Sequence, residues 1–251
     1  MSKTDVSRET YNDMNKPGRR QAEPVFDAAG EREKLTGLLE SAGIRADEKR
    51  ISLLVGYSDL IHRWNNKAGL ISKNDAGKII ERHIFESLLL TVCGDFSGKV
   101  RVLDMGTGAG LPGIPLKIWN DDIDLVLVES NRKKALFLEH AAEILDLNHT
   151  EVLCSRIEDL GKIPGFTSSF DIITGRALAP ADQLLEWAEP FLAEKGGGKC
   201  LFPKGSRLKN ELELIDKNKW SIAMKDLSGH LPKDGSKEKS LYVISALLTN
   251  T

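Results

Sequence analysis

The sequence is poor in cysteine and has no long hydrophobic run. Its three cysteines, Cys93, Cys154 and Cys200, are far apart and form no C-x-x-C pair. This spacing argues against a disulfide framework and a zinc site, and we expect the three side chains to be small buried apolar residues. No segment approaches the roughly 18 apolar residues of a membrane span, and residues 1–30 lack the apolar core of a signal peptide. We therefore expect a cytoplasmic protein without a membrane partner.

An excess of basic charge is also absent. The formal net charge of the whole chain is −2, which does not indicate the basic surface typical of a nucleic-acid-binding protein. The charge is unevenly distributed, however: residues 199–239 hold ten Lys and Arg against six Asp and Glu, and residues 132–134 are all basic. Solvated helix faces explain such clusters equally well. With 41% hydrophobic residues, the 251-residue chain can fill the core of one large α/β domain with an extension.

Residues 100–115, VRVLDMGTGAGLPGIP, form the most informative pattern in the chain. An apolar run suited to a buried strand ends at Asp104, and Gly106, Gly108 and Gly110 let the backbone turn tightly and approach a ligand closely. Pro112 fits the first turn of a following helix. A glycine-rich turn after a parallel strand presents free amides where open α/β sheets bind nucleotides. The pattern therefore predicts a ligand that contains a nucleoside.

The residues around the glycines bear on which nucleoside binds. Gly108, Gly110 and Gly113 match the G-x-G-x-x-G of dinucleotide-binding domains, which leaves an NAD(P)-dependent oxidoreductase as an alternative. Three features favour S-adenosylmethionine: Asp104 before the glycines, Glu129 at the end of the next apolar strand, and about a hundred preceding residues. Glu129 is placed to accept hydrogen bonds from both ribose hydroxyls. An ordinary glycine-rich turn with a surface acid is the remaining alternative.

The segment LDMGTGAGLPGIPLKI closely resembles the glycine motif of the bacterial small-subunit ribosomal RNA guanine-N7 methyltransferases, a family once called glucose-inhibited division protein B. Its LPGIP end is the distinctive part. The segments RWNNKAGLIS, RHIFESL, SRIE and TGRALAP resemble other parts of the family pattern. Three residues depart from it: Gly69 replaces the usual Asn, Glu86 the usual Asp and Gly175 the usual Ser.

The resemblance implies an α/β fold, that of a class I (Rossmann-like) S-adenosylmethionine-dependent methyltransferase with a seven-stranded sheet and a small N-terminal helical extension. We divide the chain into a flexible polar tail at 1–30, a helical N-terminal extension at 31–95 and a methyltransferase domain at 96–251. The apolar periodicity predicts helices at 31–42, from 47, from 76 and at 132–145. The expected strands are 100–104, 124–128, 152–154, 170–173, 199–202, 220–224 and 241–248.

The resemblance also implies roles for individual residues. The expected cofactor-binding residues are Asp104, Gly106, Gly108, Gly110, Leu111, Glu129, Ile157, Glu158 and Arg176. The expected RNA-binding residues are Arg176, Lys204, Arg207 and Lys209. Structural alternatives stay open for some of them: a capping box formed by Ser155 and Glu158, a structural salt bridge of Arg176, and a hydrogen-bonded structural role for His83. No metal site is expected.

The implied reaction is transfer of a methyl group to N7 of a guanine in a decoding-region loop of 16S ribosomal RNA. Guanine N7 has an exposed lone pair, so we assign no catalytic base and expect catalysis by positioning, with Arg176 and Lys204 placing the RNA. The expected cofactor is S-adenosyl-L-methionine, and the expected partner is 16S ribosomal RNA or the small ribosomal subunit, bound by a monomer. A non-catalytic RNA-binding protein with a methyltransferase fold is a further alternative.

Overall fold

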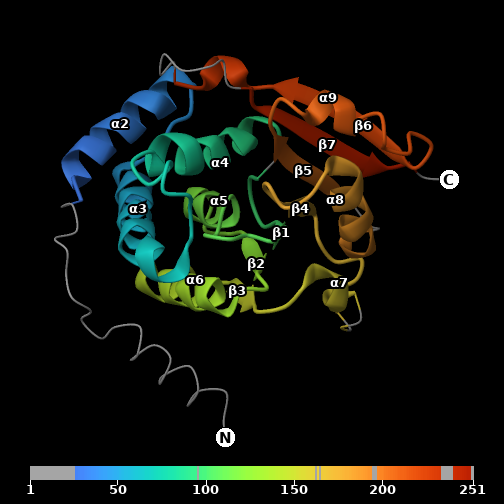
Figure 1. Cartoon of the computed structure of the whole chain (residues 1–251), viewed down its shortest axis with the longest axis horizontal. Helices are drawn as coiled ribbons and strands as arrows, with labels where there is room; N and C mark the ends of the chain where they lie inside the picture. The colour runs from blue at the N-terminus through green and yellow to red at the C-terminus, as the bar shows by residue number, and fades with distance from the viewer. Residues whose placement is uncertain are drawn as a thin grey trace, which may run out of the picture.

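The computed structural model describes residues 26–94, 96–161, 163, 165–193, 197–232 and 240–249. Most of the predicted polar tail, residues 1–25, lies outside this part of the chain. The described residues form a seven-stranded sheet in the order β3-β2-β1-β4-β5-β7-β6, which confirms the predicted fold class (Figure 1). The strands are β1 Arg101–Met105, β2 Asp124–Val128, β3 Thr150–Leu153, β4 Ile172–Thr174, β5 Lys199–Lys204, β6 Trp220–Asp226 and β7 Tyr242–Leu248.

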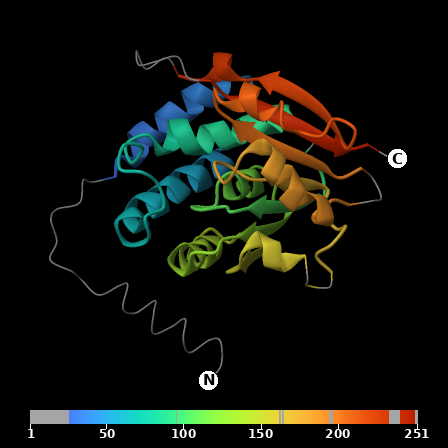
Figure 2. The same cartoon turned by 45° about the vertical axis from the view of Figure 1, so that its right-hand side comes forward.

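Strands β3, β2, β1, β4 and β5 are parallel, whereas β7 runs antiparallel to both β5 and β6. The β6–β7 pair therefore closes one edge of the sheet, and β3 forms the other (Figure 2). Strand β1 lies between β2 and β4, where its Asp104 is in register with Leu127 and Thr174. This central position explains the almost unbroken apolar run in the sequence, because both faces of β1 are covered.

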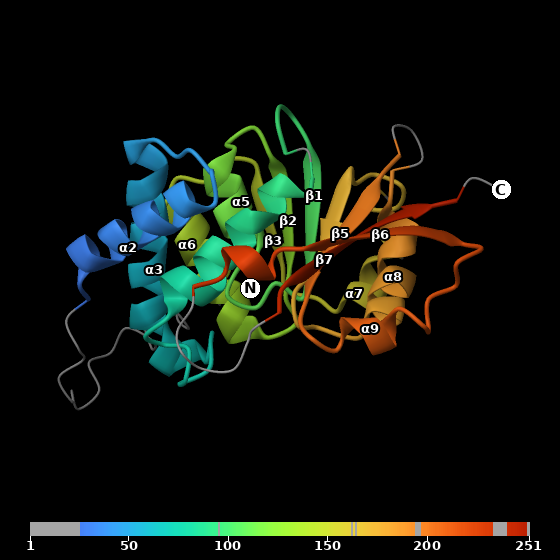
Figure 3. The same cartoon turned by 90° about the horizontal axis from the view of Figure 1, so that it is seen from above.

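Helices cover the two faces of the sheet in separate layers (Figures 1 and 3). One face carries α2 Ala28–Ser41, α3 Glu48–Ala68, α4 Glu86–Leu88, α5 Gly113–Trp119 and α6 Arg132–Ile144. The other carries α7 Ile157–Leu160, α8 Ala181–Ala188 and α9 Leu208–Glu211. Along β1, alternate side chains enter the two cores: Val102 packs with the first layer and Leu103 with the second. The N-terminal helices thus share one hydrophobic core with the sheet.

Local sequence signals explain where α3 begins and ends. The Asp47 side chain accepts a hydrogen bond from the amide of Arg50 at 2.8 Å and caps the first turn. The helix ends at Gly69, whose φ of +60° lies in the left-handed region. Glycine and asparagine are the residues that adopt this conformation most readily, so Gly69 can replace the family's usual Asn without strain.

Several predicted boundaries differ from the structure. The third helix was expected from residue 76, but residues 73–77 form a turn, held by a hydrogen bond from Ser72 to Asp75 at 2.7 Å. The helical segment follows as a π-helix at Ile80–Phe85, helix α4 and a 3-10 turn at Leu89–Val92. Strand β4 begins two residues later than expected, because Phe170 instead forms an isolated bridge with Leu192.

The expectation that all three cysteines are buried is wrong for two of them. Cys200, in the central strand β5, is fully buried, whereas Cys93 is half-buried and Cys154 is exposed just after β3. None of the helices in the described part of the chain is long and apolar enough to cross a membrane.

Candidate functional site

The strand order brings the predicted site residues to one edge of the sheet. The glycine loop follows β1, Glu129 follows β2, Ile157 begins the helix after β3, and Arg176 follows β4. Lys204 is the last residue of β5. Because these five strands are parallel and adjacent, their carboxyl ends lie side by side. Residues more than 70 positions apart in the sequence therefore lie along the same edge of the sheet.

The glycine loop, defined here as residues 106–111, has three residues in the left-handed region: Gly106, Gly108 and Gly110, with φ values of +60°, +61° and +90°. The amides of Gly110 and Leu111 both donate to the carbonyl of Thr107, at 2.9 and 3.0 Å, and close a tight turn. A Cβ atom added to Gly108 would meet nothing within 4 Å. The loop therefore leaves open space above Gly108, as expected where a ligand approaches the backbone.

Asp104 lies beneath this loop and is fully buried. Strand β1 continues to Met105, so Asp104 does not end the strand as expected. Its Oδ2 accepts hydrogen bonds from the Thr107 hydroxyl at 2.5 Å and from the Gly113 amide at 2.9 Å. Burial raises the pKa of this carboxyl to about 7, although both hydrogen bonds oppose the shift. These contacts give Asp104 a direct role in shaping the loop, while its contact with a cofactor stays a prediction.

Glu129 faces the glycine loop from the end of β2 and is only 8% exposed. Its Oε2 accepts a hydrogen bond from the Gly108 amide at 3.0 Å, and its Oε1 accepts one from the Asn131 amide at 2.7 Å. The carboxylate is thus held between the loop and the start of α6. Each carboxylate oxygen has a second lone pair, so both can accept a further hydrogen bond from a ligand.

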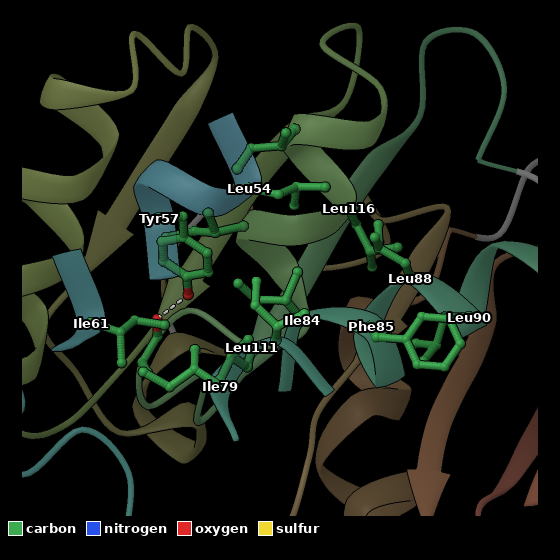
Figure 4. Close-up of a cluster of buried hydrophobic side chains, with 14 of the residues drawn as sticks. Leu54, Tyr57, Ile61, Ile79, Ile84, Phe85, Leu88, Leu90, Leu111 and Leu116 are labelled. Carbon is green, nitrogen blue, oxygen red and sulfur yellow. Dashed lines mark hydrogen bonds between the residues drawn. The ribbon is translucent and has the colours of Figure 1, made fainter. Parts of the chain in front are cut away.

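Leu111 points away from the open side of the loop. Its side chain is 7% exposed and lies in the core formed with the N-terminal helices, near Tyr57, Ile61 and Ile79 (Figure 4). The Tyr57 hydroxyl donates a hydrogen bond to the carbonyl of Ala109, drawn as a dashed line in Figure 4. The predicted contact of Leu111 with the cofactor stays a prediction, and the observed contacts of its side chain are with the interior.

The segment after β3 folds differently from the capping box considered above. Helix α7 has Arg156 at its N-cap with no side-chain cap, and the Ser155 hydroxyl donates to the carbonyl of Arg156 at 3.2 Å. Ser155 lies one residue too early to cap α7, so that alternative is wrong. Ile157 is 6% exposed in the second core, and Glu158 is exposed. Their predicted roles at the adenine stay predictions.

Arg176 makes the structural ion pair that was one of the alternatives. Its Nη2 donates to Glu86 Oε2 at 2.5 Å and to the carbonyl of Arg82 at 2.7 Å. Glu86 thus provides the carboxylate that the usual Asp provides at this position in the family pattern. Arg176 Nη1 is buried and has no hydrogen-bond partner among the described residues. One end of the guanidinium is therefore fixed, and the other end retains its donors.

His83 lies close to this ion pair on the π-helical segment. Burial, and then the positive charge of Arg176, lower the pKa of its imidazole to about 4, although Asp75 opposes the shift. Its Nε2 is buried without a hydrogen-bond partner in the described part of the chain. The ring is therefore neutral at pH 7.

A cavity of about 820 Å³ opens between the segments that follow β4 and β5. Three predicted RNA-binding residues, Arg176, Lys204 and Arg207, are among those that line it, and Lys209 is exposed on the neighbouring helix α9. Lys204 is the least accessible: its side chain is 8% exposed, and its Nζ donates to Glu211 Oε2 at 2.6 Å and to a backbone carbonyl. Arg207 and Lys209 are the exposed cations of this group.

Leu178 connects the cavity to the glycine loop. It lines the cavity, and its side chain lies so near Gly106 that a Cβ atom there would be 2.6 Å from Leu178 Cδ1. Leu178 is therefore a neighbour of both the cavity and the start of the glycine loop. Sequence reasoning missed this contact and the interactions of Tyr57, Glu86 and Glu211, because each joins segments that only the packed fold brings together.

Comparison with solved structures shows the class of fold. A predicted O-methyltransferase from Agrobacterium tumefaciens superposes with a TM-score of 0.54, at 15% identity, over 66% of this chain and 81% of that protein. A SAM-dependent methyltransferase from Aquifex aeolicus gives a TM-score of 0.52, at 18% identity, over 70% and 96%. The sheet order and these likenesses define a class I, Rossmann-like methyltransferase fold.

The chain belongs to the rRNA small subunit methyltransferase G family, whose model matches residues 50–239. Proteins named Ribosomal RNA small subunit methyltransferase G are similar to it. The protein from Roseiflexus castenholzii is 36% identical over 72% of this chain and 76% of its own length, and that from Chlorobium luteolum is 37% identical over 75% and 77%. This membership confirms the predicted family and enzyme class, and it argues against the oxidoreductase alternative.

Proposed function

We propose that the protein transfers the methyl group of S-adenosylmethionine to N7 of a guanine in a decoding-region loop of 16S ribosomal RNA. The observation that supports this most is the pairing of the Glu129 carboxylate with the Gly108 amide at 3.0 Å. The carboxylate lies beside a turn of left-handed glycines, at the carboxyl ends of two adjacent parallel strands, and this position supports a role as acceptor for ribose hydroxyls. The family membership supplies the class of reaction.

The residues present fit such a cofactor. The open space above Gly108 accommodates a ligand against the backbone, and Glu129 has lone pairs left for two hydroxyls. After β3, Glu158 is an exposed acceptor that could meet the adenine amino group, and Ile157, mostly buried in the second core, lies next to it in the sequence. The donors of Arg176 that remain after its pairing with Glu86 suit a carboxylate such as that of the methionyl group.

The cofactor supplies an electrophilic methyl group on a sulfonium centre. The chain then has only to hold the acceptor in line with it and exclude water, because guanine N7 carries an available lone pair and no proton has to be removed first. Among the described residues no cluster of three His, Cys, Asp or Glu side chains could hold a metal ion. Because no proton has to be removed from N7, we assign positioning roles to Arg176 and Lys204 and no catalytic base.

The cavity beside Leu178 is the proposed place for the RNA. Its volume of about 820 Å³ exceeds the size of a single base, and its rim carries Arg207, with Lys209 close by on α9. Guanine N7 in an RNA duplex lies in a deep, narrow groove that side chains do not reach. The target guanine must therefore come from a loop or be turned out of its stack before it enters this cavity.

Transfer of a labelled methyl group tests the proposal. Small ribosomal subunits and stripped 16S RNA, both lacking the modification, are incubated with the full chain and labelled S-adenosylmethionine. We expect label in 16S RNA, and the better acceptor of the two identifies whether ribosomal proteins help to present the target. Label only in another RNA contradicts the substrate, and the absence of transfer to either acceptor contradicts the proposed function.

A further inference from the structure

The N-terminal helices contact the backbone of the glycine loop directly. Tyr57, in the third turn of α3, is fully buried, and its hydroxyl donates a hydrogen bond to the carbonyl of Ala109, 52 residues further along the chain. A Cβ atom added to Gly110 would lie 2.9 Å from the same hydroxyl oxygen. The tyrosine therefore touches the loop at two successive residues from the side opposite its open face.

Leu111, the next residue of the loop, adds an apolar anchor. Its side chain packs in the core that Ile61, Ile79 and Ile84 of the N-terminal helices help to form (Figure 4). Three consecutive residues of the loop, Ala109 to Leu111, are thus held by the helical layer, while Gly108 faces open space. The loop has one anchored side and one side available to a ligand.

The hydroxyl of Tyr57 is suited to a permanent donor role. Burial raises its pKa well above the ordinary value, and the nearby charge of Asp104 adds to the shift. The group stays protonated wherever the protein is folded near neutral pH. Ala109 is 2% exposed, so without Tyr57 its carbonyl would have no water to replace the lost hydrogen bond.

We propose that Tyr57 is a positioning residue for the cofactor, and that the helical extension is a structural part of the cofactor site through it. The inference rests on the proposed function, since it takes S-adenosylmethionine as the ligand of the glycine loop. The tyrosine acts through the backbone: it holds the Ala109 peptide so that the amide of Gly108 stays directed at Glu129. Loss of the hydroxyl lets the loop populate other conformations, and each reduces the fraction competent to bind.

The chain offers a matched control on the same helix. Ser58 follows Tyr57, is fully buried, and its Oγ has no hydrogen-bond partner among the described residues. Ser58→Ala therefore removes a buried hydroxyl from α3 without removing a contact to the loop. Tyr57→Phe removes a buried hydroxyl that does make such a contact and keeps the aromatic ring. Thermal unfolding of both variants verifies that they fold.

The first measurement is calorimetric titration of the full chain with S-adenosylmethionine. We expect Tyr57→Phe to raise the dissociation constant by about 5- to 10-fold, the range of one lost buried hydrogen bond, and Ser58→Ala to leave it unchanged. Equal dissociation constants for wild type and Tyr57→Phe, or equal increases in both variants, overturn the inference and leave the proposed function intact. Failure of the wild-type protein to bind overturns the proposed function.

The second measurement needs no cofactor. Amide hydrogen exchange of the free protein reports how firmly the loop is held, because the amides of Gly110 and Leu111 donate to Thr107 within it. We expect Tyr57→Phe to raise their exchange rates by about 5- to 10-fold, with the amides of β2 unchanged. Unchanged exchange at Gly110 and Leu111 overturns the claim that Tyr57 holds the loop, whatever ligand the loop binds.

Discussion

The Oε2 atom of Glu129 accepts a hydrogen bond from the amide of Gly108 at 3.0 Å, so the ends of β1 and β2 are joined at the proposed cofactor site. Substitution Glu129→Ala removes this acceptor and both proposed ribose contacts. We expect it to weaken S-adenosylmethionine binding by about 10- to 100-fold, the range of one to two charge-assisted hydrogen bonds. Isothermal titration measures the effect.

Glu151→Ala is the matched control for that change, since Glu151 is an exposed glutamate on the neighbouring strand β3. We expect this variant to bind the cofactor like the wild type. Equal affinities for Glu129→Ala and the wild type would overturn the assignment of the ribose site.

The glycines of the motif differ in how much stability is lost when each is replaced by alanine. Gly113 has no left-handed backbone, but a Cβ atom there would lie 2.7 Å from Leu127 Cδ2 and 2.8 Å from Asp104 Oδ2, both in the buried interior. Gly108 has a φ of +61° with open space around it. We expect Gly113→Ala to lower the free energy of unfolding by about 2 to 3 kcal/mol through overpacking, and Gly108→Ala by about 1 kcal/mol through backbone strain. Urea denaturation of the two variants distinguishes these costs, and a larger cost at Gly108 would contradict this account.

The central strands of the sheet could be predicted from the sequence because both of their faces are covered. The predicted bounds of β2, residues 124–128, match the structure, since an apolar run between polar residues leaves few alternatives. The buried face of α6 is harder to assign, because Phe137 and Ala141 are buried whereas the adjacent apolar residues Leu136 and Ala142 are partly exposed. Phe137 packs on Trp64 of α3 at 5.8 Å between ring centroids, and this contact depends on how two helices approach each other.

The site could be predicted only in part, because some of its contacts also depend on how distant segments pack together. The glycines and Glu129 lie near one another because adjacent strands in a parallel sheet end together, which the order of strands in the sequence already indicates. The ion pair of Arg176 with Glu86 joins residues 90 positions apart and depends on the packing of the N-terminal layer. Lys204 was predicted from the sequence to bind RNA, and its pairing with Glu211 depends on the position of α9, which the sequence does not indicate.

The buried carboxyl of Asp104 makes stability depend on pH. Its pKa is about 7 in the folded protein and near the ordinary value of 3.8 in the unfolded chain, so the folded state retains a proton that the unfolded state loses. The stabilisation from this proton is complete below pH 4 and is lost as the pH rises through about 7. Asp104→Asn keeps the acceptor for Thr107 and Gly113 but does not titrate. We expect the melting temperature of the wild type, relative to this variant, to fall between pH 5 and pH 8, whereas a constant or rising difference would contradict the account.

Two of the cations that line the cavity, Arg207 and Lys204, should respond differently to removal. Arg207→Ala removes an exposed charge, so we expect weaker binding to 16S RNA, a salt-dependence slope smaller by about 1, and an unchanged melting temperature. Lys204→Met leaves Glu211 without its ion-pair partner, and we expect a loss of about 2 kcal/mol in the free energy of unfolding.

Lys217, an exposed lysine that does not line the cavity, is the control for these two variants. Filter binding at several salt concentrations and thermal unfolding separate the two effects. Reduced RNA affinity of Lys217→Ala equal to that of Arg207→Ala would show that the cavity is not the RNA site.

Identification of the methylated nucleoside tests the central claim most directly. 16S RNA lacking the modification is treated with the wild-type chain or with Glu129→Ala, digested to nucleosides, and analysed by mass spectrometry. We expect one 7-methylguanosine per 16S RNA molecule with the wild type and a strongly reduced amount with the variant. A methyl group on the ribose, on another guanine atom or on another base would contradict the proposed reaction, even though the fold and the family would stand.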